Sequence, residues 1–198
     1  MKYRLGILLL TFIFITLTGC GKDIELTIEN VDSSTIAIRE DNTLQVALID
    51  SFDQEYYDIE EFKSVIDKEI NKYNNQHGEG AIILDALEKQ EDNVILILTY
   101  GSISHYTEFN GVEGHLSGTN LAGDFTLPES FLTPKGDSVT VTQALEKDDY
   151  KIFAINEDIK ILIDGKIVYY HNGEYIDSQT LHADDEEMTY IIFKDKLF

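Results

Sequence analysis

Cys20 is the residue whose chemistry the sequence defines best, because it is the single cysteine of the chain. A cysteine thiolate is a strong nucleophile that can be alkylated at sulfur. A lone thiol in an exported chain has no partner for a disulfide, and exported proteins usually carry an even number of cysteines. The residues before it, Leu17-Thr18-Gly19, are small or aliphatic. We therefore expect Cys20 to be modified rather than oxidised.

The first nineteen residues have the layout of an export signal. Lys2 and Arg4 precede an apolar run from Leu5 to Ile15, and small residues follow it. A helix that spans a bilayer needs about twenty apolar residues, whereas this run has roughly eleven to thirteen. We predict that residues 1–19 form a signal peptide that is removed.

The end of this signal, Leu17-Thr18-Gly19-Cys20, resembles the lipobox of bacterial lipoproteins. The resemblance implies that Cys20 receives a diacylglyceryl group and that a lipoprotein signal peptidase cleaves before it. Two acyl chains, at about 0.8 kcal/mol per buried CH₂, give a stable membrane anchor. The implied location is the extracytoplasmic face of the cell membrane. Residues 20–32 would then be the acylated N-terminus and a polar tether, although 21–32 also suit a first edge strand.

Nucleophilic catalysis would require a hydroxyl or thiol beside a base. Ser102, Ser104 and His105 are close in sequence, but they fall in a predicted short helix, and no G-x-S-x-G or S-x-x-K motif is present. We predict no catalytic residue among them.

Metal binding would require ligands that converge. The five histidines are far apart in the sequence, and the densest group of potential ligands is His182-Ala-Asp-Asp-Glu-Glu187. This group lacks the spacing of an EF-hand loop, so a solvated acidic turn is the preferred interpretation. Capture of a divalent metal by Asp184–Glu187 is a weaker hypothesis, after the binding module and the hydrolase described below. We predict no metal or cofactor site.

The charge balance excludes several partners. The formal charge of −22 becomes −24 when Lys2 and Arg4 leave with the signal, and there is no cluster of Lys or Arg. Such a chain is repelled by nucleic acid and by anionic headgroups. Solubility and electrostatic repulsion from an anionic envelope are the preferred explanation of the acidity, and attraction of a cationic partner, such as a basic protein or a divalent metal, is the alternative.

Carboxylates and aromatic side chains leave two further possibilities open. A carboxylate pair could hydrolyse envelope glycans, but 37 acids offer too many pairs to select one. Phe52, Tyr56 and Tyr57 lie just before a predicted helix, while Tyr169-Tyr170 and Tyr175 lie in predicted strands. Exposed tyrosines contact sugars or proteins, although packing in a core or across strands is the commoner role.

The clearest helix begins at Asp58, where an Asp cap is followed three residues later by Glu61. The spacing predicts an amphipathic helix over 58–75 with this apolar stripe: Ile59, Phe62, Val65, Ile66, Ile70 and Tyr73. A hairpin is expected over 34–49, a second over 81–100, and a short helix over 102–110.

The second half of the chain is predicted to be rich in loops over 112–140 and rich in hairpins afterwards. Asp164-Gly165 and Asn172-Gly173 are type I′ turn signals. They separate strand candidates at 151–156, 159–163, 166–171 and 174–177, and a last strand is expected at 188–193.

These patterns predict one α+β domain over 33–198, in which an antiparallel sheet carries one long amphipathic helix. Through its lipobox and the segment Asp53–Asp67, the chain resembles uncharacterised lipoproteins of Gram-positive bacteria, a resemblance that implies no activity. We expect a non-enzymatic binding or interaction module with an envelope protein or glycan as partner, anchored through Cys20 and with no nucleic-acid role. The alternative is an envelope glycan hydrolase that uses a carboxylate pair.

Overall fold

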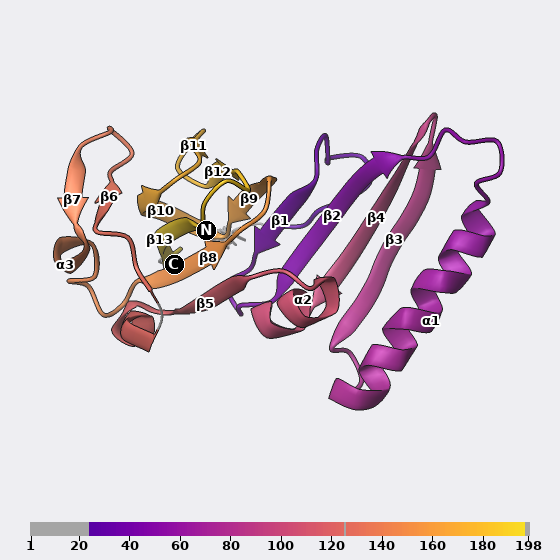
Figure 1. The fold of residues 1–198 in the computed structure, drawn as a ribbon, viewed down its shortest axis with the longest axis horizontal. Coiled ribbons are helices and arrows are strands. Elements are labelled where there is room, and N and C mark those ends of the chain that lie inside the picture. Colours follow the sequence, from indigo (N-terminus) through magenta and orange to yellow (C-terminus); the bar gives the residue numbers. More distant parts are fainter. Residues whose placement is uncertain (1–23, 125, 197–198) are drawn as a thin grey trace, which may run out of the picture.

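The computed structural model describes residues 24–124 and 126–196, which form a mixed fold of strands and three α-helices (Figure 1). Within this part of the chain the strands form two sheets rather than the one that was predicted.

Sheet A has the strand order β11-β12-β9-β1-β2-β4-β3. Its strands are β1 (Thr35–Ile38), β2 (Leu44–Ser51), β3 (Ile82–Gln90), β4 (Asn93–Tyr100), β9 (Ile159–Ile163), β11 (Glu174–Tyr175) and β12 (Thr180–Ala183). The hairpins β1–β2 and β3–β4 confirm two predicted turns. The sheet is not purely antiparallel, because β1 pairs with β9 in parallel.

Sheet B has the strand order β5-β8-β13-β10-β6-β7. Its strands are β5 (Gly114–Gly118), β6 (Ser130–Leu132), β7 (Ser138–Thr140), β8 (Lys151–Ile155), β10 (Gly165–His171) and β13 (Thr189–Asp195). Three of these short strands, with the 3₁₀ helix η1 (Thr119–Asp124), lie in the region that was expected to be loops.

The expected hairpin at Asp164-Gly165 is wrong. β9 belongs to sheet A and β10 to sheet B, so the chain changes sheet at this turn. Gly165 is required there by a close approach, since a Cβ would overlap the carbonyl oxygen of Lys194 on β13. At Asn172-Gly173 both residues have positive φ, as a type I′ turn requires, but β11 then pairs with β12 and not with β10.

The inner faces of the two sheets meet in one apolar core. It contains Ile36, Val46 and Ile161 from sheet A and Phe153, Ile191 and Phe193 from sheet B. The outer face of sheet B has a second core around Phe131, Ile152 and Ile192, to which Val141 and Leu145 at the ends of helix α3 (Val141–Ala144) add partly buried side chains.

Helix α1 (Ile59–His77) covers the part of sheet A that lies beyond sheet B, along the edge strand β3 (Figure 1). The cap predicted at Asp58 is confirmed, since its carboxylate accepts hydrogen bonds from the backbone N–H groups of Glu60 and Glu61. At the other end, the Asn74 amide exchanges two hydrogen bonds with the backbone of Ile82. Ile70 is the buried residue of the helix, whereas Val65 is 52% exposed. Ile59, Phe62 and Ile66 are partly buried, so the apolar stripe is covered along the helix except at Val65.

Helix α2 (Ile103–Asn110) joins the two sheets. Its Tyr106 is buried, and the phenol donates a 2.6 Å hydrogen bond to Glu157 in the turn between β8 and β9. Burial raises the pKa of the Glu157 carboxyl, and the hydrogen bond from Tyr106 opposes that rise without cancelling it.

Residues 24–31, the described part of the expected tether, lie across the outer face of sheet A. Leu26 is 6% exposed and packs near Ala47 and Ile97, and its N–H donates to the side chain of Gln45 at 2.7 Å. Arg39, beside the β1–β2 turn, donates to the carbonyl of Ile24. The chain therefore reaches sheet A at the end that carries this turn.

Leu26→Ala tests whether this segment is part of the folded core. Removal of a buried leucine side chain should lower the free energy of unfolding by about 2 to 4 kcal/mol, a large share of a typical total of roughly 5 to 15 kcal/mol. Urea denaturation measures the change. A loss below about 0.5 kcal/mol, as at surface positions, would show that residues 24–31 are only a tether.

Glu157→Gln tests the partly buried hydrogen bond between Tyr106 and Glu157 through its pH dependence. In the folded protein the raised pKa of Glu157 means that the carboxyl keeps its proton to higher pH than in the unfolded chain. The protonated Glu157 carboxyl therefore contributes to the free energy of unfolding at pH values below its pKa in the unfolded chain. This contribution is lost as the pH rises through its pKa in the folded protein. The glutamine keeps an acceptor for Tyr106 but cannot ionise, so its advantage over the wild type should grow as pH rises. Parallel stability curves in urea titrations across acidic and neutral pH would contradict this assignment.

Candidate functional site

The leading candidate site is a pocket of about 490 Å³ where β2 ends and α1 begins. We call it the aromatic pocket and define it by its lining residues: Asp50, Ser51, Phe52, Tyr56, Tyr57, Asp58, Glu61, Phe62, Val65 and Val94. Four of these ten side chains are aromatic rings contributed by a single stretch of the chain, from the end of β2 to the first turn of α1.

Phe52 forms the base of the aromatic pocket. Its N–H donates to the carbonyl of Asp92 at 2.6 Å, which ties the end of β2 to the β3–β4 turn. Its ring is buried and lies 4.8 Å from the ring of Tyr57 and 5.8 Å from that of Phe62. Phe52, the residue after β2, is thus held in the protein interior, whereas residues 53–57 are exposed to solvent.

Tyr56 and Tyr57 form the outer wall of the aromatic pocket. A turn in which Tyr57 N–H donates to the carbonyl of Gln54 places them just before the Asp58 cap. Tyr56 is 76% exposed and Tyr57 is 42% exposed, and their rings meet edge to face at 4.9 Å. Large aromatic side chains normally bury most of their surface, so this exposed pair makes the aromatic pocket a candidate contact surface.

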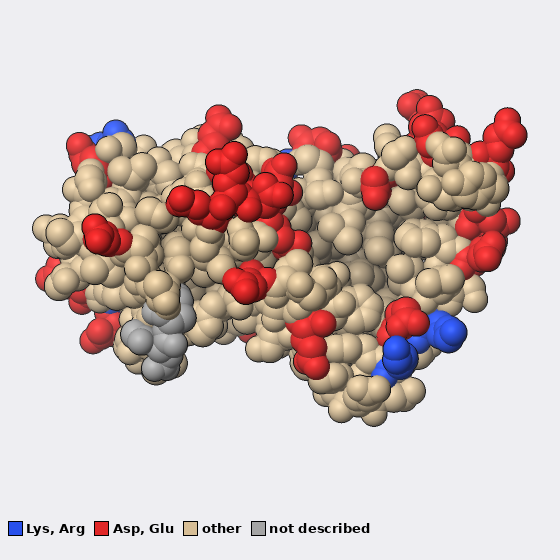
Figure 2. Space-filling model, in the orientation of Figure 1, with Lys and Arg blue, Asp and Glu red and all other residues tan. Residues whose placement is uncertain are grey.

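Carboxylates surround the aromatic pocket. Six acids lie between residues 50 and 61, and no Lys or Arg occurs between residues 40 and 62. Figure 2 shows acidic side chains over the β3–β4 turn and around the loop that leads into α1. The Gln54 amide donates to Asp53 and lowers the pKa of that carboxyl, so Asp53 is charged at neutral pH. The nearby cation is Lys89, whose Nζ lies 5.2 Å from the centre of the Phe52 ring.

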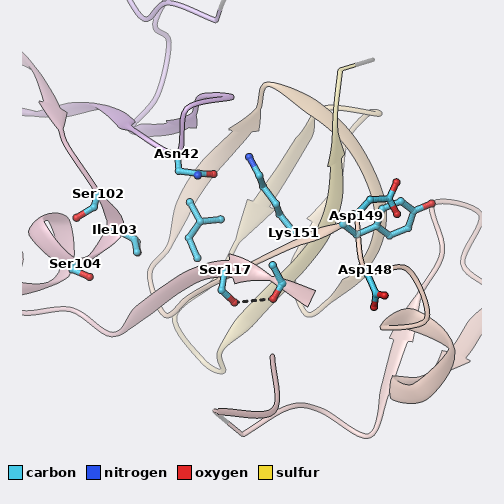
Figure 3. A pocket seen from close by; sticks show the side chains of 11 residues that line it. Asn42, Ser102, Ile103, Ser104, Ser117, Asp148, Asp149 and Lys151 are labelled. Atoms are coloured by element: carbon cyan, nitrogen blue, oxygen red, sulfur yellow. Dashed lines mark hydrogen bonds between the residues drawn. The ribbon is translucent and has the colours of Figure 1, made fainter. Parts of the chain in front are cut away.

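A second, polar pocket of about 410 Å³ lies at the opposite end of sheet A, between α2 and sheet B (Figure 3). Its polar lining comprises Asn42, Ser102, Ser104, Ser117, Asp148, Asp149 and Lys151. The amine of Lys151 is already bound to the carbonyl of Glu40 and to Asp195. In Figure 3 the carboxylates of Asp148 and Asp149 point in different directions, and both lie across the pocket from Ser102 and Ser104. The two serines therefore have no base directed at them within this view.

The structure brings together two histidines that the sequence places 28 positions apart, His77 and His105. Their ring centres are 5.9 Å apart, and both rings contact Tyr73. The Tyr73 phenol lies 3.2 Å from Nδ1 of His105 and donates to Glu108, whose other carboxylate oxygen lies 3.5 Å from Nε2 of His77. Burial and this carboxylate raise the pKa of Tyr73 to about 12, so the phenol stays protonated. The cluster fastens the C-terminal end of α1 to α2.

The C-terminal tyrosines take packing roles. Tyr169 packs into the core on the outer face of sheet B, whereas Tyr170 packs into the shared inner core. The rings of Tyr170 and Tyr175 stack with centres 5.8 Å apart. The packing role that was preferred for these residues is confirmed.

The acidic bend at Asp184–Glu187 is held by its own hydrogen bonds. Asp184 accepts from the amide of Asn172 and from the N–H of Glu186, and the bond from Asn172 lowers the pKa of its carboxyl. Across the described residues, no group of three or more His, Cys, Asp or Glu side chains is placed to hold a metal ion.

The predicted signal peptide, residues 1–19, and the lipidation site Cys20 lie outside the described residues. In the part of the chain that is described, no helix is both long and apolar enough to span a bilayer.

Comparisons of this chain with protein-family models, with curated proteins and with solved structures found no match.

Sequence reasoning singled out three of the pocket's aromatic residues but not the pocket itself. Phe52, Tyr56 and Tyr57 were conspicuous as aromatics before a helix. Val94 on β4 completes the wall and comes from a distant strand. The signal that could have located the pocket is the coincidence of aromatic residues with six acids among which no Lys or Arg occurs.

Proposed function

We propose that the protein is a lipoprotein anchored through Cys20 to the extracytoplasmic face of the cell membrane, where it acts as a non-enzymatic binding module. The Leu17-Thr18-Gly19-Cys20 motif and the apolar run before it support the anchor. The observation that carries the binding function is the exposed aromatic pocket, with Tyr56 76% exposed at its rim.

The position of the pocket suits an anchored binder. The chain reaches sheet A beside the β1–β2 turn, where Arg39 contacts Ile24, whereas the aromatic pocket follows Ser51 at the other end of β2. The eight residues of β2 extend over roughly 25 Å. From Cys20 to Ile24 the backbone extends at most about 14 Å. The anchor would therefore hold one end of sheet A near the membrane and direct the aromatic pocket away from it.

The shape and chemistry of the pocket favour binding over turnover. Tyrosine rings supply a large contact area with few rotatable bonds, so little conformational entropy is lost when a ligand covers them. A glycan hydrolase, the alternative, needs two carboxylates about 5 to 10 Å apart on opposite sides of one bond. In the polar pocket Asp148 and Asp149 lie on the same side, so these two carboxylates do not face each other across a bound sugar (Figure 3).

Cys20→Ser tests the anchor. Loss of the thiol removes the acceptor for the lipid, so the variant should leave the membrane fraction, whereas the wild type should stay in it after a wash in high salt. Cell fractionation with mass spectrometry of the N-terminus measures both. Retention of the serine variant, or an unmodified thiol in the wild type, would disprove lipid anchoring.

Tyr56→Ala combined with Tyr57→Ala tests the binding site. Removal of both rings should weaken binding to isolated envelope material by about tenfold or more, since exposed aromatics are typical interaction hot spots. Ile176→Ala is the matched control, because Ile176 is a large exposed side chain far along the chain in the β11–β12 turn. Equal binding by the wild type and the double variant would show that the aromatic pocket is not the binding surface. Release of sugar from the same material, lost in Asp149→Asn, would favour the hydrolase.

A further inference from the structure

We infer that the aromatic pocket binds a cationic polypeptide, specifically a Lys- or Arg-rich segment of another envelope protein. This inference rests on the proposed binding function and names the chemistry of its partner.

The charges around the pocket are arranged for a cation. Asp50, Asp53, Glu55, Asp58, Glu60 and Glu61 are all exposed. Among the described residues none of these six carboxylates forms an ion pair, whereas Asp67, further along α1, pairs with Lys63 and Glu69 pairs with Lys72. Apart from Asp58, whose carboxylate caps α1, the acids at the pocket are therefore available to an external cation.

A role in stabilising helix α1 explains only three of these six carboxylates. Asp58, Glu60 and Glu61 are at the start of α1, where negative charge offsets the helix dipole and caps free N–H groups. Asp50, Asp53 and Glu55 precede the helix and gain nothing from its dipole. They increase repulsion among like charges, so a role in attracting a ligand accounts for them better than a role in folding.

The aromatic rings add recognition of a cation at short range. The ammonium of Lys89, which does not line the pocket, lies 5.2 Å from the centre of the Phe52 ring, so one ring of this aromatic cluster already contacts a cation. The rings of Tyr56 and Tyr57 remain exposed. A Lys or Arg side chain can lay its aliphatic stem on these rings and its charged end among the carboxylates.

Other ligand classes fit this surface less well. Nucleic acid and anionic lipid are repelled by six neighbouring carboxylates. A neutral glycan would contact the tyrosine rings but would form no ionic interaction with the carboxylates. A Lys- or Arg-rich segment uses both features, and the open pocket at the end of a sheet can accept an extended chain.

The test uses the purified full-length protein in neutral detergent and measures fluorescence anisotropy of labelled peptides. The probes are a nine-residue peptide that alternates Lys and Arg with Gly, a Ser/Gly peptide of equal length, and a labelled oligosaccharide of N-acetylglucosamine. The variant is D50N/E55Q/D53N, which leaves the Asp58 cap intact. The matched control is D185N/E186Q/E187Q, which removes the same charge from the exposed acidic bend.

The wild type should bind the cationic peptide and neither of the other probes, and added salt should weaken this binding. The pocket variant should lose about tenfold in affinity and most of the salt dependence, while the control should stay within about twofold of the wild type. Circular dichroism and thermal melting verify that each variant is folded.

Two outcomes would overturn the inference. The first is failure of the wild type to bind the cationic peptide, or preferential binding of the oligosaccharide. The second is an equal loss of affinity for the cationic peptide in both triple variants. This result would show that binding depends on net charge alone and not on the pocket. Either result would leave the proposed binding function intact if Tyr56→Ala with Tyr57→Ala still abolishes binding to the envelope, so the two proposals can fail separately.

Discussion

The inner face of sheet A is wider than sheet B can cover, and this excess of apolar surface determines the rest of the structure. Sheet B packs on the strands β9, β1 and β2, and α1 must cover the remainder near β3. Hydrogen bonds fix the position of α1 at both ends. Asp58 caps its first turn, and the Asn74 side chain binds the backbone of Ile82 near its last turn. At the start of α1 the Phe62 side chain is only partly buried, and residues 53–58, between Phe52 and the helix, are exposed. The aromatic pocket is a consequence of this incomplete coverage.

Local elements were predictable from the sequence, but their assembly was not. Asp58 marks the start of α1 because a cap needs only the next three residues, and the β1–β2 and β3–β4 hairpins need only a turn between two apolar runs. Asp164-Gly165 carries the same turn signal, yet the chain crosses there from one sheet to the other. A turn signal reports the local backbone and not which strand becomes the partner. The parallel pair of β1 with β9 joins segments about 120 residues apart, which no local pattern encodes.

Some features of the candidate site were likewise visible in the sequence, whereas others depend on how the strands pair. The aromatic residues and the acids of the pocket are adjacent in sequence, so their coincidence was visible. The contribution of Val94, the bond from Phe52 to the Asp92 carbonyl and the cation of Lys89 depend on the pairing of β2, β4 and β3. The pair His77 and His105 likewise follows from the packing of α1 beside α2. The sequence therefore supplies the chemistry of the surface, and the sheet supplies its shape.

The central claim is that an anchored domain presents the aromatic pocket to a partner in the envelope. The most direct measurement places a photoreactive phenylalanine analogue at position 56 of the membrane-bound protein in its own envelope and identifies the cross-linked product by mass spectrometry. We expect one dominant adduct from position 56, on a segment rich in Lys and Arg, and none from position 176. Cross-linking from position 150 at the polar pocket, with none from position 56, would contradict the account.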